Sequence, residues 1–237
     1  MIPLGRVTAP WWDEKPLAIV AGGPSMKGFD LDRLRIAGVR VLAVKEIIRD
    51  LPFADAVFAL DRPWMSRRAD WLRCECPAEI FLAPVNLERE HRSVPLIEGA
   101  TYLKLARFEG FSGPGAIKPE FDDYGLLQSG GNSGFGAVNL AYLKRAGQAG
   151  KPVVLFGFDY CEPDGRHHYD DERYHWYPAG RNARYWKNWG DNFAPCMRQI
   201  SAAGMTILNA SPISTVECFP KVTHEQALDV LYRFRSA

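Results

Sequence analysis

The chain has 237 residues, of which 47% are hydrophobic and 24% charged, and these values are typical of a folded globular protein. Its 29 Lys and Arg residues are balanced by 28 Asp and Glu residues, so the overall charge points to no polyanionic partner, and only a local basic patch would. No apolar stretch approaches the roughly 20 residues of a membrane helix, and the first residues lack the basic-then-apolar pattern of a signal peptide.

Short apolar runs alternate with polar stretches in the first half, the pattern of strands in a parallel sheet. The first run, residues 17–21 (LAIVA), stops at the sequence GGPS, as a buried strand entering a tight loop does. Asp30 is expected to cap a short helix over residues 31–37. Three further strands are predicted at 39–44, 55–60 and 79–83.

Residues 84–128 contain Pro, Gly and charged residues with little periodicity, apart from a strand predicted at 101–105. Long segments of this kind are commonly insertions or lids. We therefore expect a single domain over residues 1–237 with an insertion or lid at 84–128, not a second domain.

The second half of the chain gives clearer signals. Residues 129–134 (SGGNSG) open a helix that is predicted to run to about Arg145, and residues 152–158 (PVVLFGF) form the most strand-like stretch. A helix is predicted over 186–200, a strand over 205–208, and a capping box of Thr223 and Gln226 for the last helix. The sequence predicts a Rossmann-like α/β fold, with a mostly parallel sheet and helices on both faces.

Ligands of open α/β sheets bind beyond the carboxyl ends of the strands, and the loop after the first strand is one such place. Gly22 and Gly23 let backbone N–H groups approach a phosphate or ribose, and Ser25 adds a donor. The spacing is not G-x-G-x-x-G, and an ordinary tight turn explains the loop equally well.

The loop at 129–134 combines free amides, hydroxyls and the positive end of a helix dipole. Four of its residues, Ser129, Gly130, Asn132 and Ser133, are candidates for contacting a nucleotide phosphate or ribose. A capped helix start is the alternative, although three glycines exceed what capping requires.

The third loop follows Asp159 and holds His167, His168 and His175 among many aromatic residues. Imidazole acts as a general base near neutral pH, and long loops in compact domains are usually functional. The groups expected to hold a departing phosphate are Tyr169, Tyr174, Arg166 and Arg181. Trp186 and Trp189 are interpreted as the core face of the following helix.

Metal binding is the weaker interpretation of this loop. Its ligand types are His167, His168, Asp170, Asp171 and His175, but their spacing matches no zinc template. The five cysteines are scattered, with a lone C-x-C at 74–76, which favours reduced thiols in a cytoplasmic protein. We expect no metal, and the chain also lacks a G-x-S-x-G elbow and a P-loop.

Three segments together, in this order, resemble the bacterial lipooligosaccharide sialyltransferases: residues 19–25 (IVAGGPS), 129–134 (SGGNSG) and 155–159 (LFGFD) with its Tyr- and His-containing loop. The chain is also similar to the motility-associated-factor glycosyltransferase-like domains and to short versions encoded by tailed phages. Residues 165–169 (GRHHY), 209–211 (NAS) and 218–220 (CFP) add to the phage likeness. The likeness covers most of residues 17–230, excluding 84–128.

This resemblance implies a nucleotide-sugar site, metal-independent inverting transfer and no tightly bound cofactor. The first two loops would hold the nucleotide, and tyrosines after Asp159 would steady the leaving phosphate. Where those sialyltransferases carry the base, this chain reads Gly180-Arg181-Asn182, so His168, His175 or Asp159 is the expected base. Lys45 or Glu46 stands where the family has an asparagine, so the donor is a UDP-sugar as readily as a CMP-sugar.

The acceptor is left open between a hydroxymethylated base in phage DNA, which would place the protein in a host cytoplasm, and a surface glycan. Two other classes of function also stay open. One is a pterin-type diphosphokinase that uses ATP and Mg²⁺, and the other is a non-catalytic module that binds nucleotides or nucleic acid. The sequence does not predict the oligomeric state.

Overall fold

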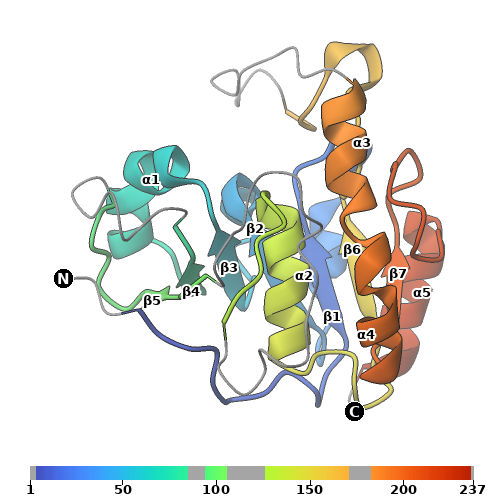
Figure 1. The fold of residues 1–237 in the computed structure, drawn as a ribbon, viewed down its shortest axis with the longest axis horizontal. Coiled ribbons are helices and arrows are strands. Elements are labelled where there is room, and N and C mark those ends of the chain that lie inside the picture. The colour runs from blue at the N-terminus through green and yellow to red at the C-terminus, as the bar shows by residue number, and fades with distance from the viewer. Residues whose placement is uncertain (1–3, 85–93, 106–125, 171–182, 236–237) are drawn as a thin grey trace.

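The computed structural model describes residues 4–84, 94–105, 126–170 and 183–235, and its centre is a 7-stranded parallel sheet (Figure 1). The strand order is β5-β4-β3-β2-β1-β6-β7. The strands are β1 (Leu17–Val20), β2 (Arg40–Val44), β3 (Ala56–Ala59), β4 (Glu79–Leu82), β5 (Thr101–Tyr102), β6 (Val153–Phe156) and β7 (Ile207–Asn209). The α-helices are α1 (Arg62–Cys74), α2 (Ser133–Leu143), α3 (Ala183–Asp191), α4 (Met197–Ala202) and α5 (His224–Phe234).

Helices cover both faces of the sheet because successive strand residues point to opposite sides. Leu17 and Ile19 of β1 pack on one face in a core that includes residues of α2 and α4. Ala18 and Val20 pack on the other face with residues of α1 and α5. All four β1 residues are fully buried, as expected for the central strand of a doubly covered parallel sheet.

The predicted Rossmann-like α/β fold is confirmed, and the sheet is wholly parallel in the described residues. All seven predicted strands are present, each with ends shifted by a few residues at most. The capping box is also present, since Thr223 accepts from the Gln226 amide and Gln226 Oε1 accepts from the Thr223 amide.

Two predicted helices were wrong in extent. The helix expected over 31–37 is only a 3₁₀ turn, Leu31–Leu34, although Asp30 does cap it. The helix expected over 186–200 divides into α3, a 3₁₀ turn at Ala194–Cys196 and α4. Pro195 lies at this division, and its ring nitrogen has no hydrogen to donate to the preceding turn.

Helix α1 was not predicted because its many arginines hide the apolar period. Asp61 caps it by accepting from the Trp64 amide, and Pro63 stands in its first turn. This pairing of a capping acid with an early proline is the signal that marks its start. Trp64, Met65 and Leu72 form its buried side.

The chain's path through the sheet creates a switch point beside β1. From β1 the strands proceed outward in order to β5, and the chain then returns across the sheet to place β6 on the opposite side of β1. Loops that leave β1 and β6 therefore diverge, and ligands of open α/β sheets bind in the resulting crevice.

Within the described ranges, none of the helices combines the length and apolar character that crossing a bilayer requires. All five cysteines are free thiols.

Candidate functional site

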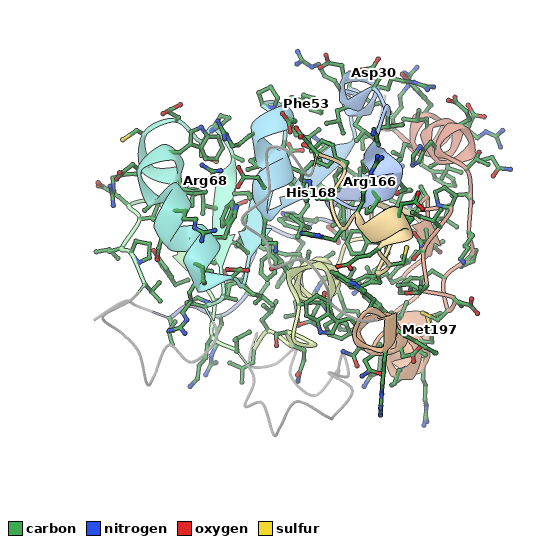
Figure 2. All side chains as sticks on the ribbon, turned by 90° about the horizontal axis from the view of Figure 1, so that it is seen from above. Asp30, Phe53, Arg68, Arg166, His168 and Met197 are labelled. Atoms are coloured by element: carbon green, nitrogen blue, oxygen red, sulfur yellow. The ribbon has the colours of Figure 1, made fainter. Side chains whose placement is uncertain are left out.

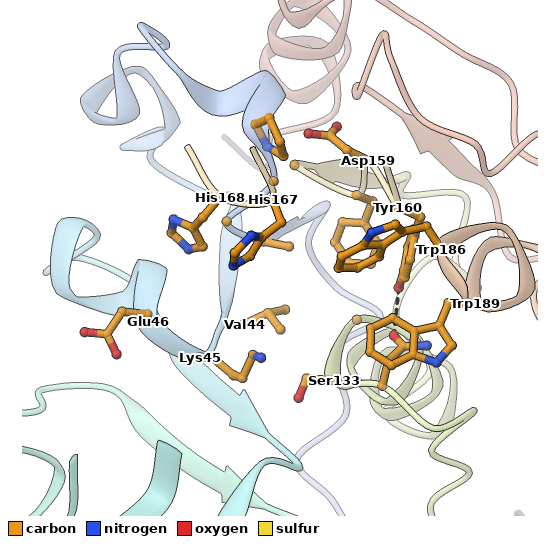
Figure 3. A pocket seen from close by; sticks show the side chains of 18 of the residues that line it. Val44, Lys45, Glu46, Ser133, Asp159, Tyr160, His167, His168, Trp186 and Trp189 are labelled. Carbon is orange, nitrogen blue, oxygen red and sulfur yellow. Dashed lines mark hydrogen bonds between the residues drawn. The ribbon is translucent and has the colours of Figure 1, made fainter. Parts of the chain in front are cut away.

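A cavity of about 320 Å³ lies at the switch point, over the carboxyl ends of β1, β2, β3 and β6 (Figure 3). The first turn of α2 and two tryptophans of α3 complete its wall. From the three predicted loops, the lining includes Gly22, Gly23, Asn132, Ser133, Asp159 and His168. The three loops are thus brought together at one place, as the sequence predicted.

Asp159 clamps the loop after β6 to the loop after β1. Its two carboxylate oxygens accept from the Ser25 amide at 2.7 Å and the Ser25 hydroxyl at 2.6 Å. Burial raises the pKa of Asp159, while the Ser25 bonds act in the opposite direction. With only 2% of its surface exposed and both oxygens engaged, Asp159 is placed to position these loops, and not to accept a proton from a substrate.

Gly23 stands where the two loops touch. A Cβ atom added to Gly23 would lie 2.4 Å from the Gly157 carbonyl oxygen and 2.5 Å from an Asp159 oxygen. Because Gly157 contributes backbone, no side-chain rotation can relieve that contact. Glycine is therefore required at position 23 for the loops after β1 and β6 to approach this closely.

His168 is held against Gly22, and a Cβ atom on Gly22 would lie 2.2 Å from its Nε2. The next residue is fastened too, since the Tyr169 amide donates to the Gly22 carbonyl at 3.0 Å. His168 Nδ1 accepts from the Asp170 amide at 3.3 Å, which assigns the proton of the neutral ring to Nε2. In this arrangement Nε2 is a donor, so His168 suits holding an anion better than removing a proton.

Tyr169 and Arg166 do not line the cavity. The Tyr169 hydroxyl donates to Asp50, and its ring packs against the core face of α1 and α5. Arg166 is exposed (Figure 2). Tyr169 thus anchors the loop. The other predicted residues here, Tyr174, His175 and Arg181, lie outside the described residues, as does Asp171.

The loop before α2 divides into a structural part and a part that faces the cavity. Gly130 has a φ of 51°, and a Cβ there would lie 2.4 Å from the Phe135 ring. Ser129 Oγ accepts from the Gly131 amide at 3.3 Å. These two residues form the turn and are not part of the cavity lining.

Asn132 and Ser133 do reach the cavity. Asn132 Oδ1 caps α2 by accepting from the Phe135 amide at 2.8 Å, and it also accepts from the Tyr160 hydroxyl at 2.8 Å. Ser133 Oγ accepts from the Leu60 amide at 3.2 Å, which ties α2 to the end of β3. The positive end of the α2 dipole therefore opens on the cavity.

Lys45 is a lining residue that sequence reasoning noted only as a departure from the family's asparagine. Its φ of 60° is a left-handed conformation, which costs a non-glycine residue roughly 1–2 kcal/mol. Its Nζ lies 3.9 Å from Asp61 Oδ2, and Figure 3 shows the side chain directed into the cavity. The fold thus places a cation here at a cost in backbone strain, a pattern often found at functional sites.

Beside Lys45, Glu46 joins the lining to helix α1, a role that the sequence did not signal. It is 1% exposed and accepts from Trp64 Nε1 at 2.7 Å and Arg68 Nε at 2.9 Å. Arg68 also pairs with its other oxygen at 2.5 Å. The carboxylate is neutralised by protein groups and fixes the end of β2.

An aromatic wall, formed by Tyr160, Trp186 and Trp189, faces Lys45 across the cavity (Figure 3). The ring centroids of the two tryptophans are 5.5 Å apart, and those of Tyr160 and Trp189 are 6.5 Å apart, both edge to face. The interpretation of both tryptophans as core residues was wrong, because each is partly exposed and lines the cavity. Burial raises the pKa of Tyr160 far above its ordinary value, so its hydroxyl keeps its proton.

His167 also lines the cavity, with Nδ1 3.9 Å from Glu162 Oε1. The turn Pro163–Gly165 between these two residues folds the loop back, with Asp164 at a φ of 54°. The sequence grouped His167 with its neighbours and did not single it out.

In the part of the chain that the structure describes, no three His, Cys, Asp or Glu side chains gather as a metal site would require. Comparisons with protein-family models, curated proteins and solved structures found no match to this chain. The resemblance to the sialyltransferases and motility-associated domains therefore stays a prediction that rests on the motifs.

Proposed function

We propose that the chain is a nucleotide-sugar-dependent glycosyltransferase that binds its donor in the switch-point cavity. The observation that carries this proposal is the pairing of two unlike walls. One wall offers backbone amides, the start of α2 and Lys45, and the other offers Tyr160, Trp186 and Trp189. A nucleotide sugar has matching parts: a charged phosphate or diphosphate and flat or hydrophobic rings.

The phosphate end is assigned to the polar wall. Gly22 and the first turn of α2, Ser133 and Gly134, contribute backbone to the cavity lining, where N–H groups suit phosphate oxygens, whereas the Gly23 amide donates to the Gly157 carbonyl at 3.1 Å. Lys45 adds a full positive charge on the same side. Such pre-organised charge stabilises a departing phosphate, and loss of one comparable group commonly costs about 3 kcal/mol of barrier.

The ring end is assigned to the aromatic wall, because aromatic faces stack on bases and sugars. The cavity volume of about 320 Å³ falls at the lower end of the range for small-molecule sites.

The proposed reaction is a single displacement with inversion. The acceptor oxygen forms a bond to the anomeric carbon as the bond from that carbon to the donor phosphate oxygen breaks, and the electron pair leaves with the phosphate. A histidine of the loop after Asp159 takes the acceptor proton. A hydroxymethylated DNA base and a surface glycan are the two proposed acceptors.

A thermal-shift panel of UDP-, GDP-, CMP- and dTDP-sugars, beside ATP with and without Mg²⁺, tests the donor class. We expect one sugar nucleotide to raise the melting temperature, since a ligand at about 100 times its Kd stabilises the fold by about 2.7 kcal/mol. Lys45→Met is the matched variant, and its shift should be smaller. A response to ATP and Mg²⁺ alone would instead support the diphosphokinase, and binding without hydrolysis or transfer would support a non-catalytic module.

A further inference from the structure

Tyr160 contacts both walls of the cavity. Its hydroxyl donates to Asn132 Oδ1 at 2.8 Å, the bond drawn as a dashed line in Figure 3. Its ring lies edge to face against Trp189 and Phe193, with centroid separations of 6.5 and 5.9 Å. Burial holds the pKa of this hydroxyl far above its ordinary value, so it stays protonated near neutral pH. Tyr160 therefore offers the cap of α2 a permanent hydrogen-bond donor.

The backbone of Tyr160 is strained where it makes this contact. Its φ of 49° is left-handed, a conformation that is unfavourable for a bulky side chain. Thr215 holds the segment in place, since its amide donates to the Asp159 carbonyl at 2.9 Å and its hydroxyl donates to the Tyr160 carbonyl at 2.9 Å. Such strain persists only where the surroundings enforce it, and it marks candidates for a functional role.

Gly134 leaves room for the Tyr160 hydroxyl. A Cβ atom on Gly134 would lie 2.4 Å from that hydroxyl oxygen. Gly134 stands in the first turn of α2, where glycine is a poor helix former and no positive φ calls for it. The position of the hydroxyl is therefore what excludes a side chain here.

The leading amides of α2 are divided between the protein and the cavity. A helix leaves its first amides without partners in the helix itself. Asn132 Oδ1 accepts from the third, Phe135, at 2.8 Å, whereas those of Ser133 and Gly134 donate to no acceptor among the described residues. Ser133 is 7% exposed, and its Oγ accepts from the Leu60 amide at 3.2 Å, but no described residue accepts its hydroxyl proton. Three hydrogen-bond donors on residues that line the cavity are thus left for a ligand.

We propose that Tyr160 is a positioning residue that keeps the Asn132 cap away from the amides that bind the donor phosphate. This inference rests on the proposed donor site and names a residue that maintains it. An N-cap oxygen can accept from the second or the third amide of its helix. Because Oδ1 also accepts from the Tyr160 hydroxyl, it is held on the third amide, and the second, that of Gly134, is left for phosphate. The alternative is close at hand, since a Cβ atom on Gly134 would lie 3.3 Å from Oδ1.

Tyr160→Phe is the first test, and it should fold because it removes one oxygen atom from a ring that stays packed. For the sugar nucleotide that gives the largest thermal shift with the unaltered protein, isothermal titration should show a Kd about 10-fold higher, the size expected when one hydrogen bond to a charged group is lost. In donor hydrolysis KM should rise with it while kcat is unchanged, because the bond acts on binding alone. Tyr102→Phe is the matched control: that hydroxyl donates to the Pro95 carbonyl at 2.6 Å at the far edge of the sheet, so the Kd should not change.

The double variant Asn132→Ser with Tyr160→Phe tests whether Tyr160 acts through the cap. A serine cap accepts from the third amide and has no carboxamide to turn, so in this background Tyr160→Phe should change the Kd by less than about 2-fold. A loss of the full 10-fold would mean that the hydroxyl contacts the donor itself, and it would overturn the inference. A fall in kcat at an unchanged Kd would overturn it too, since the hydroxyl would then meet the departing phosphate.

A measurement without ligand separates this inference from the proposed function. In the nuclear magnetic resonance spectrum of the unliganded protein, the Gly134 amide proton should move downfield in Tyr160→Phe, because it gains Asn132 Oδ1 as an acceptor, and should not move in the double variant. If this shift appears but no sugar nucleotide binds, the proposed function fails and the control of the cap by Tyr160 stands. If the donor binds but Tyr160→Phe changes neither the Kd nor the Gly134 signal, Tyr160 has only a structural role and the inference is overturned.

Discussion

The two ends of helix α2 are treated in opposite ways. At its C-terminal end, Lys144 is 3% exposed and donates to the carbonyls of Thr8 at 2.6 Å and Pro10 at 3.3 Å. Its ammonium also lies near the rings of Trp12 and Phe81. At the N-terminal end, Asn132 supplies only a neutral cap, and the helix opens on the cavity.

The two ends of α2 differ in whether the protein places a charge against the helix dipole. A helix dipole is negative at its C-terminus, and there the chain places its own cation and uses it to fasten the N-terminal segment. At the positive end the chain places no carboxylate on the first turn, which itself contains the small residues Ser133, Gly134 and Gly136. The protein itself supplies a charged partner at the C-terminal end, whereas the N-terminal end has a neutral cap and no acidic residue in its first turn, and we propose that the donor phosphate binds there.

The largest expected loss of stability comes from a change in the turn before the N-terminal end of α2. Gly130→Ala should destabilise the fold by about 3 kcal/mol, because the added Cβ is strained at positive φ and strikes the buried Phe135 ring. Gly150→Ala, beyond the other end of the helix, is the matched control: it has the same sign of φ but open space around it, and should cost about 1 kcal/mol. Urea denaturation followed by circular dichroism measures both, and equal losses would contradict the argument.

A somewhat smaller loss of stability is expected from a change at the C-terminal end of α2. Lys144→Met should cost about 2 kcal/mol, since the Thr8 and Pro10 carbonyls lose a charged donor. Lys151→Met is the control, because Lys151 makes an exposed bond to the Phe234 carbonyl, and the change in stability should stay within about 0.5 kcal/mol.

The contribution of Lys144 to stability is expected to change with pH in a definite direction. Burial lowers the pKa of Lys144 from 10.5, so at alkaline pH the unfolded chain holds a proton that the folded chain has released. Stability from this group therefore rises as pH increases between the lowered value and 10.5. The advantage of the unaltered protein over Lys144→Met should grow across that window, and a shrinking advantage would show that Lys144 behaves as an ordinary paired lysine.

Asn132→Asp places a negative charge of the protein at the N-terminal end of α2, just as Lys144 places a positive charge at the C-terminal end. Aspartate still accepts from the Phe135 amide and the Tyr160 hydroxyl, but it cannot replace the bond that Asn132 Nδ2 donates to the Gly130 carbonyl at 3.3 Å, so the melting temperature should fall slightly. Its charge should weaken donor binding about 10-fold, or about 1.4 kcal/mol, as isothermal titration would measure. Asn132→Ser keeps a cap without charge and should leave affinity nearly unchanged. Equal affinities for the two variants would remove the donor phosphate from this end of α2.

The smallest effect concerns Lys45. Lys45→Gly and Lys45→Ala both remove the ammonium and should weaken donor binding alike, but only alanine keeps the strain of a φ near 60°. The glycine variant should therefore be more stable than the alanine variant by about 1 kcal/mol. If alanine proves as stable as glycine, the strain is relieved elsewhere.

The fold was largely predictable because strands such as β1 and β6 are uninterrupted apolar runs that end in glycine loops. Gly22, Gly23, Asn132 and Ser133 were predicted at the site for the same reason, since small and capping residues have local signatures. The different surroundings of His167 and His168 were not predictable. Which ring faces Gly22 and which faces the cavity depends on contacts among residues far apart in the sequence.

Trp186 illustrates the same limit. A helical period of aromatic residues describes a face but does not say what that face meets, and here it meets a cavity. Pro195, by contrast, carried a local signal for the break between α3 and α4.

The central place of β1 has a consequence for how the protein is made. Ser25 and Asp159, which join the two loops, are separated by 134 residues. During synthesis β1 can pair with β2 early, but its other edge stays unpaired until β6 has left the ribosome. An open apolar strand edge invites pairing with other chains, so the nascent chain is most prone to aggregate before that moment. Variants that slow the closure of β6 onto β1 should therefore reduce soluble yield more than their equilibrium stability alone accounts for.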